Sequence, residues 1–142
     1  MKKHLLLCFL LAIIACDATD PLYDPYPAQL TGTWQLAEVL ADPGDGSGTY
    51  RPVDSDKSIV FFEDGRFEAN QNMCAAGDSD DLRNTGTYSL ADATLTVTNC
   101  HFGASEEALK LHFTIDEGAL YISYPCIEPC GEKYVRISNN ND

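Results

Sequence analysis

The chain has 142 residues, of which 44% are hydrophobic, and its 22 acidic and nine basic side chains give a formal charge of −13. This excess of acids argues against a nucleic-acid-binding protein and against adhesion to anionic lipid headgroups. About 110 residues remain after the N-terminal region, which is enough for one domain with a single hydrophobic core.

The N-terminus has the three parts of a secretory signal. Two lysines lie in residues 1–4, residues 5–14 form an unbroken apolar run, and the small residue Ala15 follows. This order predicts export and cleavage. The apolar run is shorter than the roughly 20 residues that span a bilayer, so we interpret residues 1–15 as a signal peptide and not as a transmembrane helix.

The sequence Ile13-Ile14-Ala15-Cys16 resembles the lipobox of bacterial lipoproteins. The resemblance implies cleavage before Cys16 and a diacylglycerol on its sulfur, whereas the alternative is an ordinary signal peptide with an incidental cysteine. Lipidation would anchor the protein to a membrane of the bacterial cell envelope, and we expect the outer membrane, facing the periplasm or the surface. Residues 16–29 contain three prolines and three acids without any periodicity, which predicts a disordered tether.

Four cysteines follow Cys16, an even number that suits disulfides in an oxidising compartment. Four cysteines allow three pairings, and we favour Cys74 with Cys100 and Cys126 with Cys130, because the last two can close a short loop. A zinc site is the alternative. No pair has the Cys-x-x-Cys spacing of common zinc sites, and the protein is exported, so we expect disulfides and no metal.

Short β-forming segments separated by turn residues fill the rest of the chain. The clearest is 109–116, where apolar and polar residues alternate without a fault, as in a half-buried strand. Asp64-Gly65 and Glu117-Gly118 each separate two apolar runs, as hairpin turns do. We predict a loop over 99–108 with one helical turn at 104–108. The predicted strands span residues 31–40, 57–63, 66–70, 85–90, 93–98, 109–116, 119–124 and 132–138, with brief pairing at 49–53.

This spacing indicates an all-β domain over residues 30–138, an antiparallel up-and-down barrel of about eight strands. Sequential hairpins favour a meander, and closure removes the open edges that so many strands would otherwise expose. Residues 139–142 are predicted to be a disordered tail.

Residues 30–36, Leu-Thr-Gly-Thr-Trp-Gln-Leu, resemble the opening of a lipocalin. In that family the tryptophan of Gly-x-Trp plugs the closed end of an eight-stranded barrel, and an arginine near the last strand packs over the indole. The resemblance assigns these roles to Trp34 and Arg136. Residues 61–67 also resemble a hairpin of small bacterial lipocalin-like lipoproteins. The chain departs from full-length lipocalins because it lacks their C-terminal helix and their Thr-Asp-Tyr turn.

A lipocalin-like barrel implies a ligand cavity lined by the inward face of each strand. The alternative is that these side chains fill the barrel, so we keep two hypotheses. One is a small apolar or amphipathic ligand inside the barrel, and the other is a filled barrel that acts as a surface module for proteins or glycans. The residues predicted to line the cavity are Leu36, Phe61, Phe67, Tyr88, Val97, Phe113, Ile122 and Tyr124.

Other chemistry has weaker signals. His112 falls on the polar face of its strand and His101 in a loop, and neither is next to a nucleophile motif, so we predict no enzyme. We also predict no cofactor, and the sequence carries no signal for an oligomeric state. Two acidic loops offer oxygen ligands for calcium but lack the EF-hand pattern, so tight turns explain them more simply. These loops contain Asp42, Asp45 and Ser47, and Asp78, Asp80 and Asp81.

Overall fold

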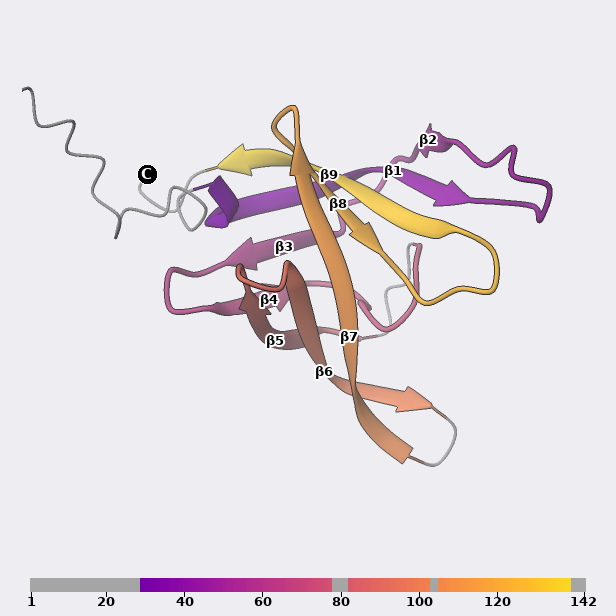
Figure 1. Ribbon diagram of the computed structural model, residues 1–142. Coiled ribbons are helices and arrows are strands. Elements are labelled where there is room, and N and C mark those ends of the chain that lie inside the picture. Colours follow the sequence, from indigo (N-terminus) through magenta and orange to yellow (C-terminus); the bar gives the residue numbers. More distant parts are fainter. Residues whose placement is uncertain (1–28, 78–81, 103–104, 139–142) are drawn as a thin grey trace, which may run out of the picture.

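The computed structural model describes residues 29–77, 82–102 and 105–138, which form nine strands (Figure 1). Eight of the strands form a closed barrel, and the short β2 lies beside it. None of the helices in these ranges is long and apolar enough to cross a bilayer. The strands are β1 (Gly32–Ala41), β2 (Tyr50–Pro52), β3 (Ser58–Phe61), β4 (Arg66–Ala69), β5 (Asn84–Ser89), β6 (Thr94–Phe102), β7 (Ser105–Asp116), β8 (Ala119–Ser123) and β9 (Cys130–Ser138).

Every neighbouring pair of strands is antiparallel, and β1 closes the barrel by pairing with β9. Two strands share the opposite edge of β1. Its first half pairs with β3, with Gly32 opposite Phe61, and its second half pairs with β2, with Leu40 opposite Tyr50. The prediction of an antiparallel up-and-down barrel is therefore confirmed, including the brief pairing near residues 49–53.

The hairpin turns follow the predicted sequence signals. Gly65 and Gly118 have φ values of +85° and +79°, in the left-handed region where glycine has no steric penalty. Glu117 also has a positive φ, of +48°, as a tight two-residue hairpin requires. The turns fix the register of the strands beside them, so that Phe61 pairs with Phe67 and Asp116 with Ala119.

The predicted loop over 99–108, with a helical turn at 104–108, is wrong. Strand β6 continues to Phe102 and β7 begins at Ser105, and their pairing continues with Cys100 opposite Glu107. A bulge between Val97 and Cys100 allows this extension. The ladder hydrogen bonds of the hairpin outweigh the local helix propensity of the alanines and glutamates.

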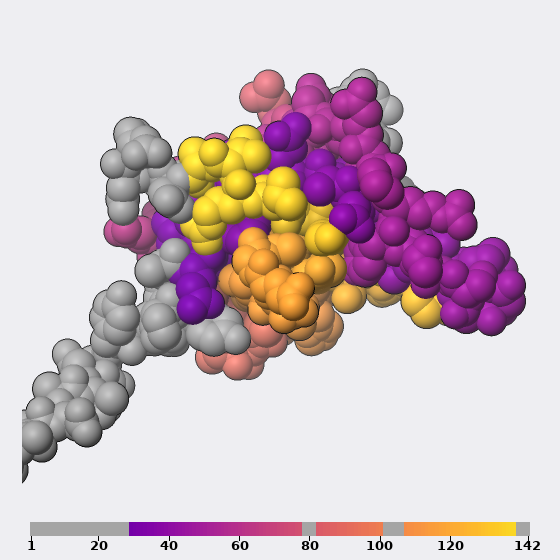
Figure 2. Space-filling view, turned by 90° about the horizontal axis from the view of Figure 1, so that it is seen from above, coloured from indigo at the N-terminus to yellow at the C-terminus, as the bar shows by residue number. Residues whose placement is uncertain are grey.

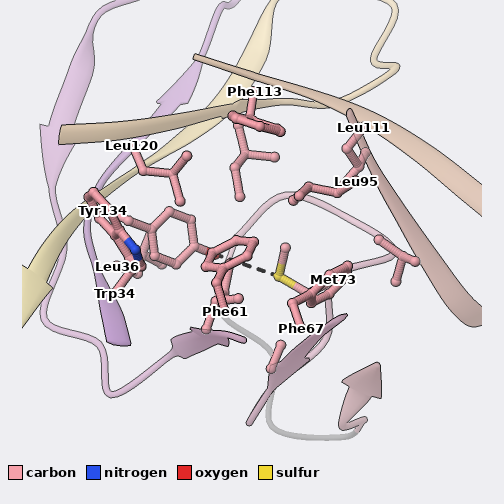
Figure 3. Close-up of a cluster of buried hydrophobic side chains, with 14 of the residues drawn as sticks. Trp34, Leu36, Phe61, Phe67, Met73, Leu95, Leu111, Phe113, Leu120 and Tyr134 are labelled. Carbon is pink, nitrogen blue, oxygen red and sulfur yellow. Dashed lines mark hydrogen bonds between the residues drawn. The ribbon is translucent and has the colours of Figure 1, made fainter. Parts of the chain in front are cut away.

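The inward side chains of the strands meet in one hydrophobic core (Figure 3). Ile59 and Phe61 of β3 alternate with Val60, which is half-buried, as the two-residue period of a strand dictates. Met73 comes from the segment after β4 and lies among the same side chains. The fully buried core residues include Trp34, Phe61, Phe67, Met73, Leu95, Leu120, Ile122 and Tyr134.

The two ends of the barrel differ. At one end β1 begins and β9 ends, with Thr33 opposite Ser138, and we call it the closed end. At the other end β1 finishes beside the start of β9, with Ala41 opposite Cys130, and we call it the mouth. The loop after β1 projects beyond the barrel at the mouth (Figure 2, purple).

Candidate ligand site at the barrel mouth

Trp34 seals the closed end. Its indole is 1% exposed, and its Nε1 donates a hydrogen bond to the carbonyl oxygen of Leu30 at 2.7 Å. The Arg136 guanidinium lies over the indole, 4.4 Å from the ring centroid, and donates to the carbonyl oxygen of Thr31. Arg136 is half-buried, and this burial lowers the pKa of its guanidinium. The indole and the guanidinium together cover this end of the barrel.

Seven of the eight residues predicted to line a cavity lie in the core, and they pack against one another. Phe61 and Phe67 have ring centroids 5.8 Å apart. Tyr88 is half-buried, packs edge-on against Phe61 and donates a hydrogen bond from its hydroxyl to the carbonyl oxygen of Phe62. The middle of the barrel is therefore filled by side chains, and Tyr124, which directly follows β8, reaches the mouth.

A buried ion pair lies below the mouth. Lys57 and Glu132 have fully buried side chains, and Lys57 Nζ lies 2.6 Å from Glu132 Oε1. The Glu132 carboxylate also accepts hydrogen bonds from the hydroxyls of Tyr124 and Tyr134, at 2.6 and 2.7 Å on Oε2. Burying two charges is costly unless they are paired and fully hydrogen-bonded, and these contacts meet that requirement.

The same ion pair holds the chain segment that follows β4. Gly77 donates its backbone N–H to Glu132 Oε1 at 2.8 Å and accepts from Lys57 Nζ at 2.9 Å. Earlier in the segment, the backbone N–H of Met73 donates to Asn84 Oδ1 at 2.7 Å. We call residues 71–77 the plug segment. Its backbone is fixed at both ends, and Met73 points from it into the barrel.

This ion pair was not predicted from the sequence, although the two-residue period of the strands contained a signal for it. Lys57 is two residues before Ile59 and four before Phe61, so it lies on the inward face of the strand. Glu132 likewise precedes the inward Tyr134 by two residues. Lys57 directly precedes β3 and Glu132 is the third residue of β9, and charged residues near the start of a strand are usually expected to be solvated. Lys57 and Glu132 are also 75 residues apart in the sequence, so no local pattern connects them.

Above the plug segment lies an open pocket of about 410 Å³. Its walls come from the end of β1, the plug segment and the connection between β8 and β9. The side chains that line it carry no formal charge, and the hydroxyl of Tyr124 is already bonded to Glu132. The pocket thus offers apolar surface and few free polar groups. Its lining residues are Val39, Leu40, Ala41, Cys74, Ala75, Ala76, Tyr124, Pro125, Cys126 and Cys130.

Two disulfides border the pocket, and both have the favoured pairing. Cys74–Cys100 joins the plug segment to β6, and Cys126–Cys130 closes the loop before β9. Three of these four half-cystines line the pocket. Disulfides form and persist in oxidising compartments, so the pairing indicates an extracytoplasmic protein.

The loop after β1 is a set of tight turns, as the simpler interpretation predicted. Asp42 accepts backbone hydrogen bonds from Gly44, Gly46 and Gly48, and these bonds, that of Gly48 first, lower the pKa of its carboxyl group. Asp45 accepts from Ser47, which lowers the pKa of Asp45. The backbone N–H of Asp42 also donates to the carbonyl oxygen of Pro129 at 3.0 Å, which joins this loop to the Cys126–Cys130 loop.

The remaining candidates are dispersed or lie outside the described residues. His112 is exposed on β7 and is not among the residues that line the pocket. The side chain of His101 and residues Asp78, Asp80 and Asp81 lie outside the described part, as does Cys16. Within the described part, no cluster of three or more histidine, cysteine, aspartate or glutamate residues could hold a metal ion.

A family model described as a lipocalin-like domain matches residues 30–142 and so covers the whole barrel. This match supports the resemblance that the sequence itself suggested. Comparison with curated proteins returns no match for the chain.

Proposed function

Since this chain belongs to the lipocalin-like domain family, we propose that it is a lipid-anchored lipoprotein of the bacterial cell envelope that binds a small apolar or amphipathic molecule at its barrel mouth. The family typically consists of binding domains without enzymatic activity. In this proposal residues 1–15 are a cleaved signal, residues 16–29 a tether attached through Cys16, residues 30–138 the binding domain and residues 139–142 a tail.

The mouth pocket is the observation that carries the binding proposal. Ligand pockets in proteins have volumes of roughly 300–1,000 Å³ and mostly apolar walls, and a volume of about 410 Å³ falls in that range. Binding would bury apolar surface of the ligand against Val39, Ala76 and Pro125. Most of the residues that the sequence predicted to line a cavity would instead lie below the pocket and pack under its floor.

A probe-binding experiment tests this function. The neutral dye N-phenyl-1-naphthylamine fluoresces when it enters an apolar site, and we expect it to bind the chain that begins at Asp17, which contains every described contact. Ala76→Phe would fill the pocket and weaken binding at least about tenfold, because the ring would occupy the space of the dye. Ala91→Phe is the matched control, since Ala91 is exposed in the turn between β5 and β6. Equal binding by both variants would contradict the proposal.

The anchor has its own test. Expression of the full chain in a bacterium should yield a mature protein that partitions with membranes and whose N-terminal peptide carries the mass of a lipidated cysteine. Cys16→Ala should abolish both properties while the signal region stays otherwise intact. A membrane-free protein with an unmodified Cys16 would contradict the lipoprotein assignment, but it would leave ligand binding at the mouth open.

One observation favours a second function, an interaction module. The Cys126–Cys130 loop presents Ile127 with its side chain fully exposed, which is unusual for a large apolar residue. The loop is held by its disulfide and by the Asp42–Pro129 hydrogen bond, so it loses little freedom on binding. Ile127→Ser should leave dye binding unchanged and weaken only the contact with a protein partner.

A further inference from the structure

We propose that Met73 is a stopper beneath the mouth pocket, which limits the ligand to compact apolar molecules and excludes long acyl chains from the barrel. This inference rests on the proposed function, because it names the class of ligand that the same pocket accepts. It goes further by assigning the limit on ligand length to one residue outside the strands.

The position of Met73 separates the pocket from the core. Its side chain is fully buried, and its Sδ lies 3.9 Å from the hydroxyl oxygen of Tyr124 and 3.7 Å from that of Tyr134. Tyr124 lines the pocket, and so does Cys74, the residue after Met73. Phe61 and Phe67 of the core lie beside Met73 (Figure 3). A ligand that enters from the mouth therefore meets Tyr124 and Cys74 first, and Met73 behind them.

The stopper is fixed in place by contacts with four separate parts of the chain. Gln71 Nε2 donates to Asp56 Oδ1 at 2.6 Å, before β3. The backbone of Met73 donates to Asn84 on β5, and the Cys74–Cys100 disulfide attaches the next residue to β6. Gly77 is held by the ion pair of Lys57 and Glu132. Moving Met73 aside would break several of these contacts at once, so we expect the stopper to stay in place when a ligand binds.

This arrangement has a consequence for affinity. Each methylene that leaves water for an apolar site raises affinity about fourfold. The gain stops when the site is full, because further methylenes remain in water. In an open barrel a growing alkyl chain would continue into the interior, whereas in a pocket of about 410 Å³ above a fixed Met73 the part of the chain that exceeds this volume stays in water.

A series of 1-alkanols tests the limit. Each alcohol from butanol to hexadecanol displaces N-phenyl-1-naphthylamine from the chain that begins at Asp17. We expect affinity to rise about fourfold per methylene for the short alcohols and to level off within the series. A rise that continues undiminished to hexadecanol would overturn the stopper and leave the binding function standing. If neither the dye nor any alcohol binds, the proposed function fails, and this inference fails with it.

Variants test whether Met73 is the residue that sets the limit on ligand length. Met73→Ala should move the plateau to longer alcohols, because the shortened side chain opens space behind Tyr124. Met73→Leu has a similar volume and should keep the plateau of the natural chain. Leu30→Ala is the matched core truncation, since Leu30 is fully buried at the closed end, and it should not move the plateau. An unchanged plateau in a folded Met73→Ala protein would overturn the role of Met73. The series on the natural chain decides the length limit even if that variant fails to fold.

Discussion

The two ends of this barrel are closed by different physical means. At the closed end an indole and a guanidinium stack at 4.4 Å, and backbone carbonyls accept their N–H groups. At the mouth, a buried ammonium and a buried carboxylate hold a segment of chain across the barrel. The closed end needs only two side chains and short-range hydrogen bonds. The mouth needs charges, two tyrosines and a disulfide, and above them it leaves a pocket.

This difference has a consequence for stability. When a packed aromatic ring is truncated, the protein loses stability in proportion to the contacts that are removed. A buried ion pair behaves differently, because removing one partner leaves the other as an uncompensated charge, whereas removing both can be nearly neutral. At the mouth, the free energy of unfolding should therefore fall more when one charged partner is replaced than when both are. The closed end should not show this pattern.

The largest expected effect is at the ion pair. Lys57→Met leaves the Glu132 carboxylate buried without its counter-charge, and we expect it to lower the free energy of unfolding by about 3–5 kcal/mol. Urea denaturation followed by circular dichroism measures the change. The double variant Lys57→Met with Glu132→Gln removes both charges and keeps an acceptor for Gly77 and the tyrosines. It should be more stable than the single variant, and a double variant that is less stable would contradict the charge argument.

The two disulfides should differ in their contributions. Cys74 and Cys100 are 26 residues apart and Cys126 and Cys130 only four, so the chain-entropy model gives about 3.5 and about 2 kcal/mol respectively. Replacing each pair by alanines and comparing the two proteins by urea denaturation tests this order. The first replacement also frees the plug segment, so it should alter dye binding. If removal of the Cys126–Cys130 disulfide lowers the free energy of unfolding more, this loop must also contribute contacts that depend on its cross-link.

A smaller effect is expected at the closed end. Arg136→Met keeps an apolar chain over Trp34 but removes the cation, and a cation–π contact of this kind contributes about 0.5–2 kcal/mol. Arg136→Lys keeps a positive charge without the planar guanidinium. Its free energy of unfolding should therefore lie between those of the natural protein and Arg136→Met. Dye binding at the mouth should be unchanged in both. A loss of dye binding would mean that the two ends are coupled through the core.

The contrast between the ends also separates what the sequence could predict from what it could not. Trp34 and Arg136 lie on regular strands at recognisable positions, so resemblance placed both before the structure was known. The strand at 109–116 was predictable from its alternation, and the disulfide pairing from the short Cys126–Cys130 spacing.

The mouth was less predictable, because its features depend on contacts between distant segments. Nothing in the polar stretch around Met73 indicates that this methionine is buried, since its environment comes from Tyr124 and Tyr134, more than 50 residues later. The helical turn at 104–108 failed for a related reason, because pairing with β6 overrode local propensity. Local patterns thus predicted the barrel, and tertiary contacts decided how it is closed at the mouth.

The final prediction uses pH to distinguish the two ends. Burial, and then the nearby Glu132 carboxylate, raise the pKa of Tyr124 well above its ordinary value of 10.0. Above pH 10 the unfolded chain therefore loses the Tyr124 proton while the folded chain keeps it. Stability is full below that pH and falls as the pH rises, by at most about 1.4 kcal/mol per pH unit from this group. Urea denaturation between pH 8 and 11 measures the slope. Tyr124→Phe has no proton to lose and should show a shallower slope, although it is less stable at neutral pH, whereas Arg136→Met should keep the natural slope. An equal slope in Tyr124→Phe would mean that the alkaline loss arises from a group other than Tyr124.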